Sequence, residues 1–400
     1  MKKIAFVIPD LYSRGMPRVL ESLENSISKS DYDKYIILLK RKPIKFHVEG
    51  KIIEIEYEGK SFLSKLCIFI KRLVKLYNIN KKYKFDYIIS FGMTSNIISI
   101  IVFKYGKVKC KRIIITEHNV KSIENNIGKS IKTLIYNKVY NFFIRKLYNK
   151  ADNIVSVSKY IGLDLIKNYG IKKEKICTIY NGVNKELIDS LKYEALSDSE
   201  YEIFKNPVII NVGALSLQKG QWHLIKIMPE LRKKIPNIQL VILGDGEYYK
   251  DLLNLVKRLN LTECVHLLGI KNNPYKYMYN AKIFVLSSLY EGFPNVLVEA
   301  MTVGIPVISV DCKSGPRELL NDEIDICIKD NYFLADYGIL TPDFFENKCI
   351  ENINEEILEK AITKLLKDKN LYCKYRTLSV SRSKEFTSVK MMNYYKNYFD

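Results

Sequence analysis

The sequence has 400 residues, of which 47% are hydrophobic, and a formal net charge of +20. At roughly 150 residues per domain this length predicts two or three domains, and the hydrophobic content excludes a chain that is disordered throughout. Residues 60–150 contain 20 basic and three acidic residues, a net of +17, whereas residues 201–400 contain 26 and 24. A basic region joined to a nearly neutral half indicates two domains with different partners. An anionic membrane, a nucleic acid and an anionic substrate are all candidates.

The N-terminus, the longest uncharged stretch and the cysteines indicate the cellular compartment of the protein. The apolar run Ile4–Ile8 ends at Pro9 and is too short for a secretory signal. The longest uncharged stretch, Tyr87–Phe103, is too short and too polar for a spanning helix. The eight cysteines include no Cys-x-x-Cys pair, which argues against a disulfide framework or a structural zinc site. We therefore expect a cytoplasmic protein.

Short β-branched runs alternate with helical patterns along the chain. In the first half the expected strands are Lys3–Ile8, Tyr35–Leu39, Ile52–Tyr57, Tyr87–Ser90, Arg112–Thr116, Asn153–Ser156 and Lys175–Ile179. In the second half they are Val208–Val212, Ile238–Leu243, Val265–Leu268, Ile283–Ser287 and Pro306–Val310. Helices are expected there at Trp222–Lys234, Tyr249–Leu259, Asn295–Val303 and Asn354–Leu366. The mostly apolar strands are typical of sheets buried on both faces, so the pattern predicts an α/β protein with two parallel, doubly wound sheets.

A domain boundary is expected near the middle of the chain. The stretch 193–201 is acidic and polar, and Pro207 comes just before a new strand. We expect a basic N-terminal domain over residues 1–190, a linker over 191–206 and a second domain over 207–383. Residues 384–400 are rich in Tyr, Met and Lys, and we expect a terminal helix there that packs back on the N-terminal domain.

Two segments carry most of the N-terminal charge. In Lys60–Tyr77 and Lys129–Lys150, apolar residues recur at helical spacing and Lys and Arg fill the positions between them. One interpretation is two ordinary surface helices with their apolar faces turned inward. The other is a surface that binds an anionic membrane, where each basic residue contributes about 1 kcal/mol.

The most specific chemical signal is Glu291-Gly-Phe-Pro-Asn-Val-Leu-Val-Glu299, in which seven residues separate two carboxylates. It follows a predicted strand, and Pro294 suits the first turn of a helix, where its missing N–H is not needed. Free N–H groups at such a helix start suit a diphosphate, and Glu299 could accept hydrogen bonds from a ribose diol. Taken alone, the same residues also fit a loop glutamate followed by a solvated helical one.

Further motifs surround this element in a fixed order. They are Ile154-Val-Ser-Val-Ser158, Ile179-Tyr-Asn-Gly-Val-Asn184, Val212-Gly-Ala-Leu-Ser-Leu-Gln-Lys-Gly220, Ile242-Leu-Gly-Asp-Gly246, Gly304-Ile-Pro-Val-Ile308, Gly315-Pro-Arg-Glu318 and Gly338-Ile-Leu-Thr-Pro342. Together they resemble the family-4 retaining glycosyltransferases of the GT-B fold (glycosyl transferases group 1). The resemblance extends over nearly the whole chain and is densest in residues 151–342. It implies two Rossmann-like domains facing each other across a cleft, the first binding the acceptor and the second the nucleotide sugar.

The resemblance also implies a catalytic set consisting of Glu291, Lys219 and His118. Glu291 would lie against the donor sugar. Lys219 would pair with the diphosphate and offset the charge that grows on the leaving group. His118, in Thr116-Glu-His-Asn119, matches a family histidine that faces the donor sugar. Without the resemblance, Lys219 is a surface lysine after a turn and His118 a hydrogen-bonded loop histidine.

The implied binding residues extend this set. Glu299 would hold the ribose, and the backbone N–H groups of Gly292 and Phe293 would reach the sugar hydroxyls. The donor-binding residues expected in all are Glu299, Gly292, Phe293, Pro294, Asn295, Val296, Gly213 and Gly244.

Two loops depart from the family pattern. Where the family often has an arginine after the glycine of the first C-domain loop, this chain has Ala214, so more of the burden of binding the diphosphate falls on Lys219 and the helix start. The first N-terminal loop usually carries paired glycines, but here it has one glycine, in Arg14-Gly15-Met-Pro-Arg18. We expect Arg14, Gly15 and Arg18 to contact the acceptor, with Arg14 as an added cation.

The expected activity is retaining transfer of a hexose or N-acetylhexosamine from a nucleotide diphosphate sugar, with UDP as the expected nucleotide. The acceptor would be a lipid-linked or membrane-surface glycan in bacterial surface-polysaccharide assembly, such as lipopolysaccharide or capsule. The enzyme would be attached peripherally to the inner face of the cytoplasmic membrane through the two basic segments. No Asp-x-Asp motif appears where a nucleotide–metal bridge is expected, so neither a metal nor another cofactor is implied.

Two other functions remain open at this point. A nucleotide-sugar epimerase has the same two-domain architecture, although the paired glutamates argue against it. A nucleic-acid-binding protein could use the basic half and stack bases on some of the 29 tyrosines. It would leave the donor-site motifs unexplained, and we expect no nucleic-acid partner.

Overall fold

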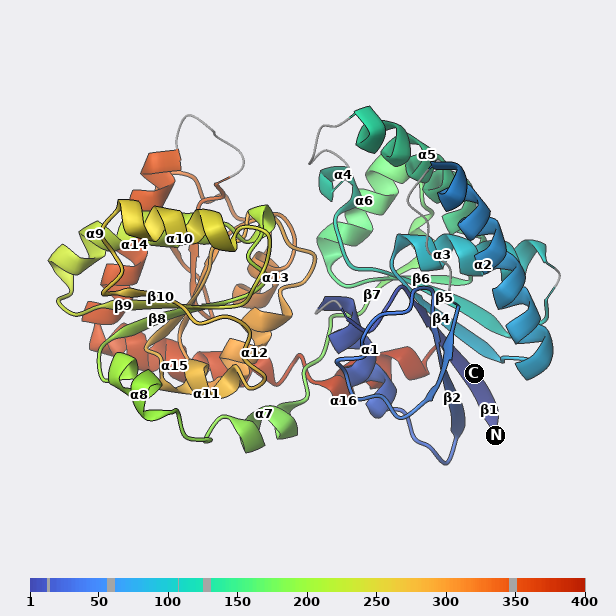
Figure 1. The fold of residues 1–400 in the computed structure, drawn as a ribbon, viewed down its shortest axis with the longest axis horizontal. Helices are drawn as coiled ribbons and strands as arrows, with labels where there is room; N and C mark the ends of the chain where they lie inside the picture. Colours follow the sequence, from blue (N-terminus) through green and yellow to red (C-terminus); the bar gives the residue numbers. More distant parts are fainter. Residues whose placement is uncertain (13–14, 56–61, 107, 125–130, 345–350, 400) are drawn as a thin grey trace. The chain divides into compact units, whose positions relative to one another are not determined.

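Two seven-stranded sheets organise the part of the chain that the structure describes. The structure is a computed structural model, and it describes all residues except 13–14, 56–61, 107, 125–130, 345–350 and 400 (Figure 1). One unit contains residues 1–182 and 388–400, and the other contains residues 183–387. The prediction of an α/β protein with two doubly wound sheets is confirmed.

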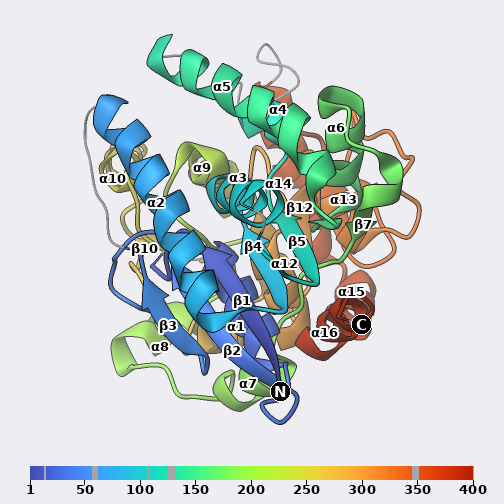
Figure 2. The same ribbon diagram turned by 90° about the vertical axis from the view of Figure 1, so that its right-hand side faces the viewer.

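The first unit has a parallel sheet in the order β3-β2-β1-β4-β5-β6-β7. Its strands are β1 (Lys2–Ile8), β2 (Tyr32–Leu38), β3 (Lys51–Glu54), β4 (Tyr87–Phe91), β5 (Arg112–Glu117), β6 (Asn153–Ser156) and β7 (Ile176–Thr178). Its α-helices are α1 (Gly15–Asn25), α2 (Phe62–Tyr83), α3 (Met93–Ile100), α4 (Lys121–Glu124), α5 (Ile131–Leu147), α6 (Lys159–Tyr169) and α16 (Ser388–Lys396). Helices α2, α3, α5 and α6 cover one face of the sheet, and α1 and α16 cover the other (Figures 1 and 2).

The second unit repeats this plan, with the strand order β10-β9-β8-β11-β12-β14-β13. Its strands are β8 (Val208–Val212), β9 (Gln239–Leu243), β10 (Val265–Leu267), β11 (Ile283–Leu286), β12 (Val307–Val310), β13 (Phe333–Leu334) and β14 (Ile339–Thr341). Its α-helices are α7 (Lys185–Leu191), α8 (Asp198–Phe204), α9 (Gln221–Lys234), α10 (Tyr249–Arg258), α11 (Tyr275–Asn280), α12 (Asn295–Val303), α13 (Pro316–Leu320), α14 (Glu351–Lys367) and α15 (Lys369–Ser383). Only β13 runs antiparallel to its neighbour among the described strands of this sheet.

The boundary between the units lies earlier than the sequence predicts. The chain enters the second unit at Val183, and residues 191–206 belong to that unit instead of forming a linker. The acidic stretch is folded because Glu200 of α8 accepts hydrogen bonds from Lys271 (2.8 Å) and Tyr277 (2.6 Å). Burial alone would raise the pKa of Glu200, but these hydrogen bonds lower it to about 2. The polar composition therefore suggested a solvated linker, whereas the structure has a helix whose Glu200 is hydrogen-bonded to Lys271 and Tyr277.

Residues 384–399 contain one described helix, α16, and it packs on the first unit as predicted. Helix α15 ends at Ser383 in the second unit, and α16 begins at Ser388 in the first. Met391, Met392 and Tyr395 of α16 are buried in the hydrophobic core that α1 forms with the sheet of the first unit. At the crossing, the backbone N–H of Val183 donates to the carbonyl of Phe386 (2.9 Å), which holds together the outgoing and returning segments of the chain.

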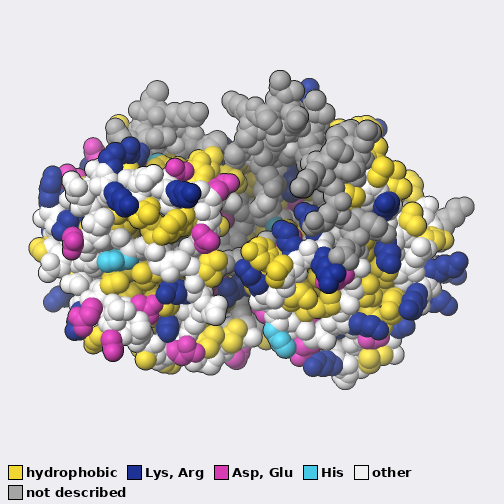
Figure 3. Space-filling view, viewed as in Figure 1, with side chains coloured by type: hydrophobic (Ala, Val, Ile, Leu, Met, Phe, Trp, Pro, Cys, Tyr) yellow, Lys and Arg dark blue, Asp and Glu magenta, His cyan; other side chains and the backbone are white. Residues whose placement is uncertain are grey.

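The two basic segments fall mainly on α2 and α5. In α2, Leu76 and Ile79 are buried, yet Leu66, Ile70 and Val74 are 53%, 52% and 55% exposed. Val139 and Phe142 of α5 are exposed in the same way. On the face of the first unit drawn in Figure 3, Lys and Arg side chains lie beside exposed hydrophobic ones. No helix in the described residues has the length and apolar character needed to cross a bilayer.

Candidate active site

In the second unit, the loop between β11 and α12 brings Glu291 and Lys219 together. Glu291 is 6% exposed, and its Oε1 lies 2.5 Å from Nζ of Lys219. The hydroxyl of the buried Ser288 donates to the same oxygen at 2.6 Å. Oε1 thus accepts two hydrogen bonds, while Oε2 accepts none from the residues that the structure describes. The carboxylate presents one free oxygen as an acceptor to a ligand.

Lys219 is held in place by the backbone on either side of it. It ends a 3-10 turn, Leu217–Lys219, and its carbonyl accepts a hydrogen bond from the hydroxyl of Ser287 (2.9 Å). Gly220 follows in the left-handed conformation, and a Cβ there would lie 2.3 Å from the Ser287 carbonyl oxygen. Only glycine allows this approach, so the strand end at Ser287 and the lysine loop are fixed against each other.

Gly213 and Gly244 form the surface against which the Lys219 side chain packs. The methylene carbons of Lys219 lie 3.5–3.6 Å from where a Cβ on Gly213 would be. Gly244 has a φ of +152°, and a Cβ there would lie 1.8 Å from the carbonyl oxygen of Gly213. The two glycines therefore let two loops pack closely, which sets the path of the lysine side chain.

The start of α12 differs in detail from the expectation. Pro294 precedes the helix, and the N–H groups of Asn295 and Leu297 are bonded to the carbonyls of Phe293 (3.0 Å) and Pro294 (2.9 Å). Fewer open N–H groups therefore remain for an anion than the sequence predicts. Glu299 lies inside α12 and is 4% exposed.

A second loop, which leads into the Gly315-Pro-Arg-Glu318 motif, supports Gly292, Phe293 and Pro294. Gly292 and Phe293 are buried, and the hydroxyl of Ser314 donates to the carbonyl of Gly292 (2.6 Å). A Cβ on Gly315 would lie 2.4 Å from Cδ of Pro294. Ser288 and Ser314 were not predicted, because serine is common in loops and neither has a distinctive spacing.

Ala214 is exposed and brings no charge to the lysine loop. Its carbonyl accepts a hydrogen bond from Nε2 of Gln221 (3.0 Å). Val296, on the first turn of α12, is half-buried. Of the residues predicted to meet the diphosphate, Lys219 is the one with a side-chain cation.

His118 lies in the first unit, directly after β5. Its Nε2 is 2.8 Å from Oγ1 of Thr116, and its ring stacks on Phe91 with the centroids 5.6 Å apart. Burial, and next the nearby charge of Lys121, lower the pKa of His118 to about 3. The imidazole is therefore neutral at physiological pH. His223 and His266 bond instead to Glu355 and Gln239, consistent with structural roles.

The expected acceptor residues lie around the start of α1. Arg14 is outside the described residues. Gly15 is exposed with open space around its Cα, and Arg18 is half-buried in the first turn. Met16 lies against Gly92, at the carboxyl end of β4. This loop is therefore at the same edge of the first sheet as His118.

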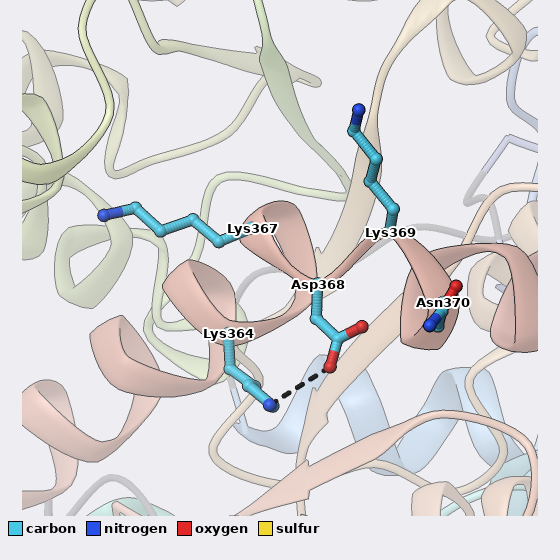
Figure 4. Close-up of a pocket in the computed structure, with 5 residues that line it drawn as sticks. All are labelled: Lys364, Lys367, Asp368, Lys369 and Asn370. Carbon is cyan, nitrogen blue, oxygen red and sulfur yellow. Dashed lines mark ion pairs between the residues drawn. The ribbon is translucent and has the colours of Figure 1, made fainter.

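A surface hollow of about 550 Å³ lies apart from all these residues. It is at the junction of α14 and α15 (Figure 4). Its lining residues are Lys364, Lys367, Asp368, Lys369 and Asn370. An ion pair of 3.1 Å joins Lys364 to Asp368 there. None of the predicted site residues line this hollow.

Two Rossmann-like domains define the GT-B class of fold. The comparison with known proteins supports the assignment of this chain to that class. Residues 13–187 match the family model described as Glycosyltransferase Family 4, and residues 194–336 match Glycosyl transferases group 1. The solved structure of HepE from Anabaena in complex with UDP-glucose covers 100% of this chain and 99% of its own, with a TM-score of 0.73 and 19% identity. That likeness concerns the fold alone.

Two relatives match over most of their length. An uncharacterised glycosyltransferase of Methanocaldococcus jannaschii is 33% identical over 358 residues, 86% of this chain and 87% of its own. The N-acetylgalactosamine-N,N'-diacetylbacillosaminyl-diphospho-undecaprenol 4-alpha-N-acetylgalactosaminyltransferase of Campylobacter jejuni is 30% identical over 397 residues, 98% of this chain and 97% of its own. The chain belongs to the family-4 glycosyltransferases with the GT-B fold, and it is a glycosyltransferase.

Proposed function

We propose that this glycosyltransferase moves a hexose or N-acetylhexosamine, with retention of configuration, from a UDP-sugar to a glycan carried on a polyprenyl diphosphate. The observation that carries the proposal is the Lys219–Glu291 pair in the loop before α12. The name of the Campylobacter relative supports the acceptor and the N-acetylhexosamine class. HepE, solved with UDP-glucose, supports the nucleotide. The pathway that we infer is the assembly of a surface polysaccharide such as lipopolysaccharide or capsule.

The geometry supports different binding roles for Lys219 and Glu291. The ammonium group of Lys219 has three N–H donors, and its contact with Glu291 uses one of them. Two donors are left for phosphate oxygens, where they stabilise the negative charge that develops as the sugar–phosphate bond breaks. Oε2 of Glu291 can at the same time accept hydrogen bonds from sugar hydroxyls.

We propose front-face substitution as the route to retention. The C1–oxygen bond to the diphosphate breaks and a bond from C1 to the acceptor oxygen forms on the same face. The acceptor hydroxyl proton passes to the departing phosphate oxygen. A double displacement needs a carboxylate nucleophile with a second carboxyl group about 5 Å away. Glu291 is instead engaged by Lys219 and Ser288, which suits a binding role.

A membrane surface is the second part of the proposal. The exposed side chains of Leu66, Ile70 and Val74 are four residues apart, so they form one stripe along α2. Lys71 and Lys75 are exposed next to it. Such a combination suits a helix at an anionic interface, and an acceptor carried on a lipid would be reached there.

The test is a panel of nucleotide sugars offered with synthetic polyprenyl-diphosphate glycans, with products identified by mass spectrometry. We expect the mass of one hexose or N-acetylhexosamine to be added to the acceptor. NMR should show a retained anomeric configuration, and EDTA should leave the transfer rate unchanged. Inversion of configuration, or loss of activity in EDTA that added metal restores, would contradict the mechanism. Interconversion of nucleotide sugars without any acceptor would favour an epimerase instead.

A further inference from the structure

The hydrogen bond between Thr116 and His118 has a defined direction. Oγ1 of Thr116 lies 3.0 Å from the carbonyl oxygen of Ser90, which can only accept. A hydroxyl has one proton, so Thr116 donates it to Ser90. The contact of 2.8 Å between Oγ1 and Nε2 of His118 must then be donated by the ring. The opposite direction would leave two oxygen lone pairs facing each other at 3.0 Å.

The two hydrogen bonds of the Thr116 hydroxyl fix the tautomer of the His118 ring. A neutral imidazole has one N–H and one lone pair, and the bond at one nitrogen decides which atom is protonated. Here the proton is on Nε2, and Nδ1 bears the lone pair. No hydrogen bond joins Nδ1 to any residue in the described part of the chain. Phe91 stacks on the ring, which further limits its rotation.

We infer that Thr116 is a positioning residue, which holds His118 as the Nε2–H tautomer and so presents Nδ1 as a fixed hydrogen-bond acceptor. The substrate group that meets His118 must then be a donor, such as a sugar hydroxyl or an amide N–H. A phosphate or carboxylate oxygen would be repelled by the lone pair. The substrate class rests on the proposed function, whereas the tautomer rests on contacts within the first unit alone.

The tautomer can be measured directly by long-range proton–nitrogen NMR on the full chain labelled with ¹⁵N-histidine. The chain has four histidines, so loss of one signal in His118→Gln assigns the ring. We expect a protonated, pyrrole-type Nε2 and an unprotonated, pyridine-type Nδ1, unchanged between pH 5 and pH 8. A proton on Nδ1, or a ring that becomes charged within that interval, would overturn the inference.

Two variants test the part played by Thr116. In Thr116→Val, which keeps the shape of this fully buried side chain, we expect a mixture of tautomers and a roughly tenfold loss in kcat/KM for transfer, with affinity for UDP unchanged. Thr116→Ser keeps the hydroxyl and should retain the wild-type spectrum. A wild-type spectrum in Thr116→Val contradicts the inference. If that variant does not fold, the spectra of the wild type and of Thr116→Ser decide whether Nε2 of His118 carries the proton. The spectra need no substrate, so absence of sugar transfer would count against the proposed function alone.

Discussion

At the scale of single residues, the loop between β11 and α12 depends on hydrogen bonds that the sequence does not reveal. Lys219 and Glu291 could be singled out because both lie in motifs with a fixed order along the chain. The direct contact between them, at 2.5 Å, could not be predicted, because it depends on how two loops pack. Ser288 lies three residues before Glu291 and is fully buried, and it donates to the oxygen that Lys219 also contacts.

Removal of the Ser288 hydroxyl is expected to weaken catalysis without unfolding the protein. In Ser288→Ala, Glu291 keeps the contact with Lys219 but loses one of the two donors that orient it. A hydrogen bond to a charged group contributes about 1.5–3 kcal/mol, so kcat/KM for the nucleotide sugar should fall at least about tenfold. The matched control is Ser383→Ala, a buried serine that bonds to the carbonyl of Val380 outside the site. Equal losses in the two variants would show that Ser288 has no special role.

At the scale of elements, most strands and long helices follow from the sequence, and the exceptions have physical reasons. Helix α12 has the predicted bounds, Asn295–Val303, because a proline before it and an apolar stretch within it agree. β13 and β14 were missed because they have two and three residues, too few to show a period. Helix α8 was missed because its acidic residues suggest solvent, and the contacts of Glu200 come from residues over 70 positions away.

The role of Glu200 predicts a pH dependence of stability. Its pKa is about 2 in the folded protein, below its ordinary value of 4.5, so its contribution is present above about pH 4.5 and is lost as the pH falls towards 2. Glu200→Gln should lower the free energy of unfolding by about 1 kcal/mol at pH 7, and the deficit should shrink below pH 4.

Glu202 on the same helix is the control for this experiment. Its pair with Lys205 is exposed, so Glu202→Gln should change stability by less than about 0.5 kcal/mol at either pH. Urea titrations of the three proteins at pH 7 and pH 3 make the comparison. A deficit of Glu200→Gln that is the same at both pH values would contradict the role given to Glu200.

At the scale of the whole molecule, the uneven charge can be assigned to particular helices. The surface-helix interpretation describes one face of α2, and the membrane interpretation stays a proposal for the exposed face. One face packs inward through Leu76 and Ile79, as in an ordinary surface helix, while Leu66, Ile70 and Val74 stay exposed beside lysines. Periodicity predicted the helix, but it could not tell which of two apolar stripes would pack inward.

A substitution in the exposed stripe tests the membrane proposal. Ile70→Glu should weaken binding to vesicles of phosphatidylcholine with phosphatidylglycerol about tenfold, because it removes apolar area and adds like charge. Ile353 is the matched control, since it has the same 52% exposure but lies in the second unit. Cosedimentation of the wild type, Ile70→Glu and Ile353→Glu measures the difference. Equal binding by the three proteins would rule out the α2 stripe as the attachment surface.

The central claim is that Lys219 and Glu291 form the donor site, and the most direct measurement is the rate of sugar transfer by Lys219→Ala and Glu291→Ala. Removal of a group that stabilises transition-state charge costs about 100-fold to 1,000-fold, and we expect losses of that order in both variants. Lys226→Ala is the control, because Lys226 also pairs with a glutamate, Glu355 at 3.0 Å, outside the site. It should retain near wild-type transfer. Wild-type rates in Lys219→Ala and Glu291→Ala, with the donor at or below its KM, would contradict the account.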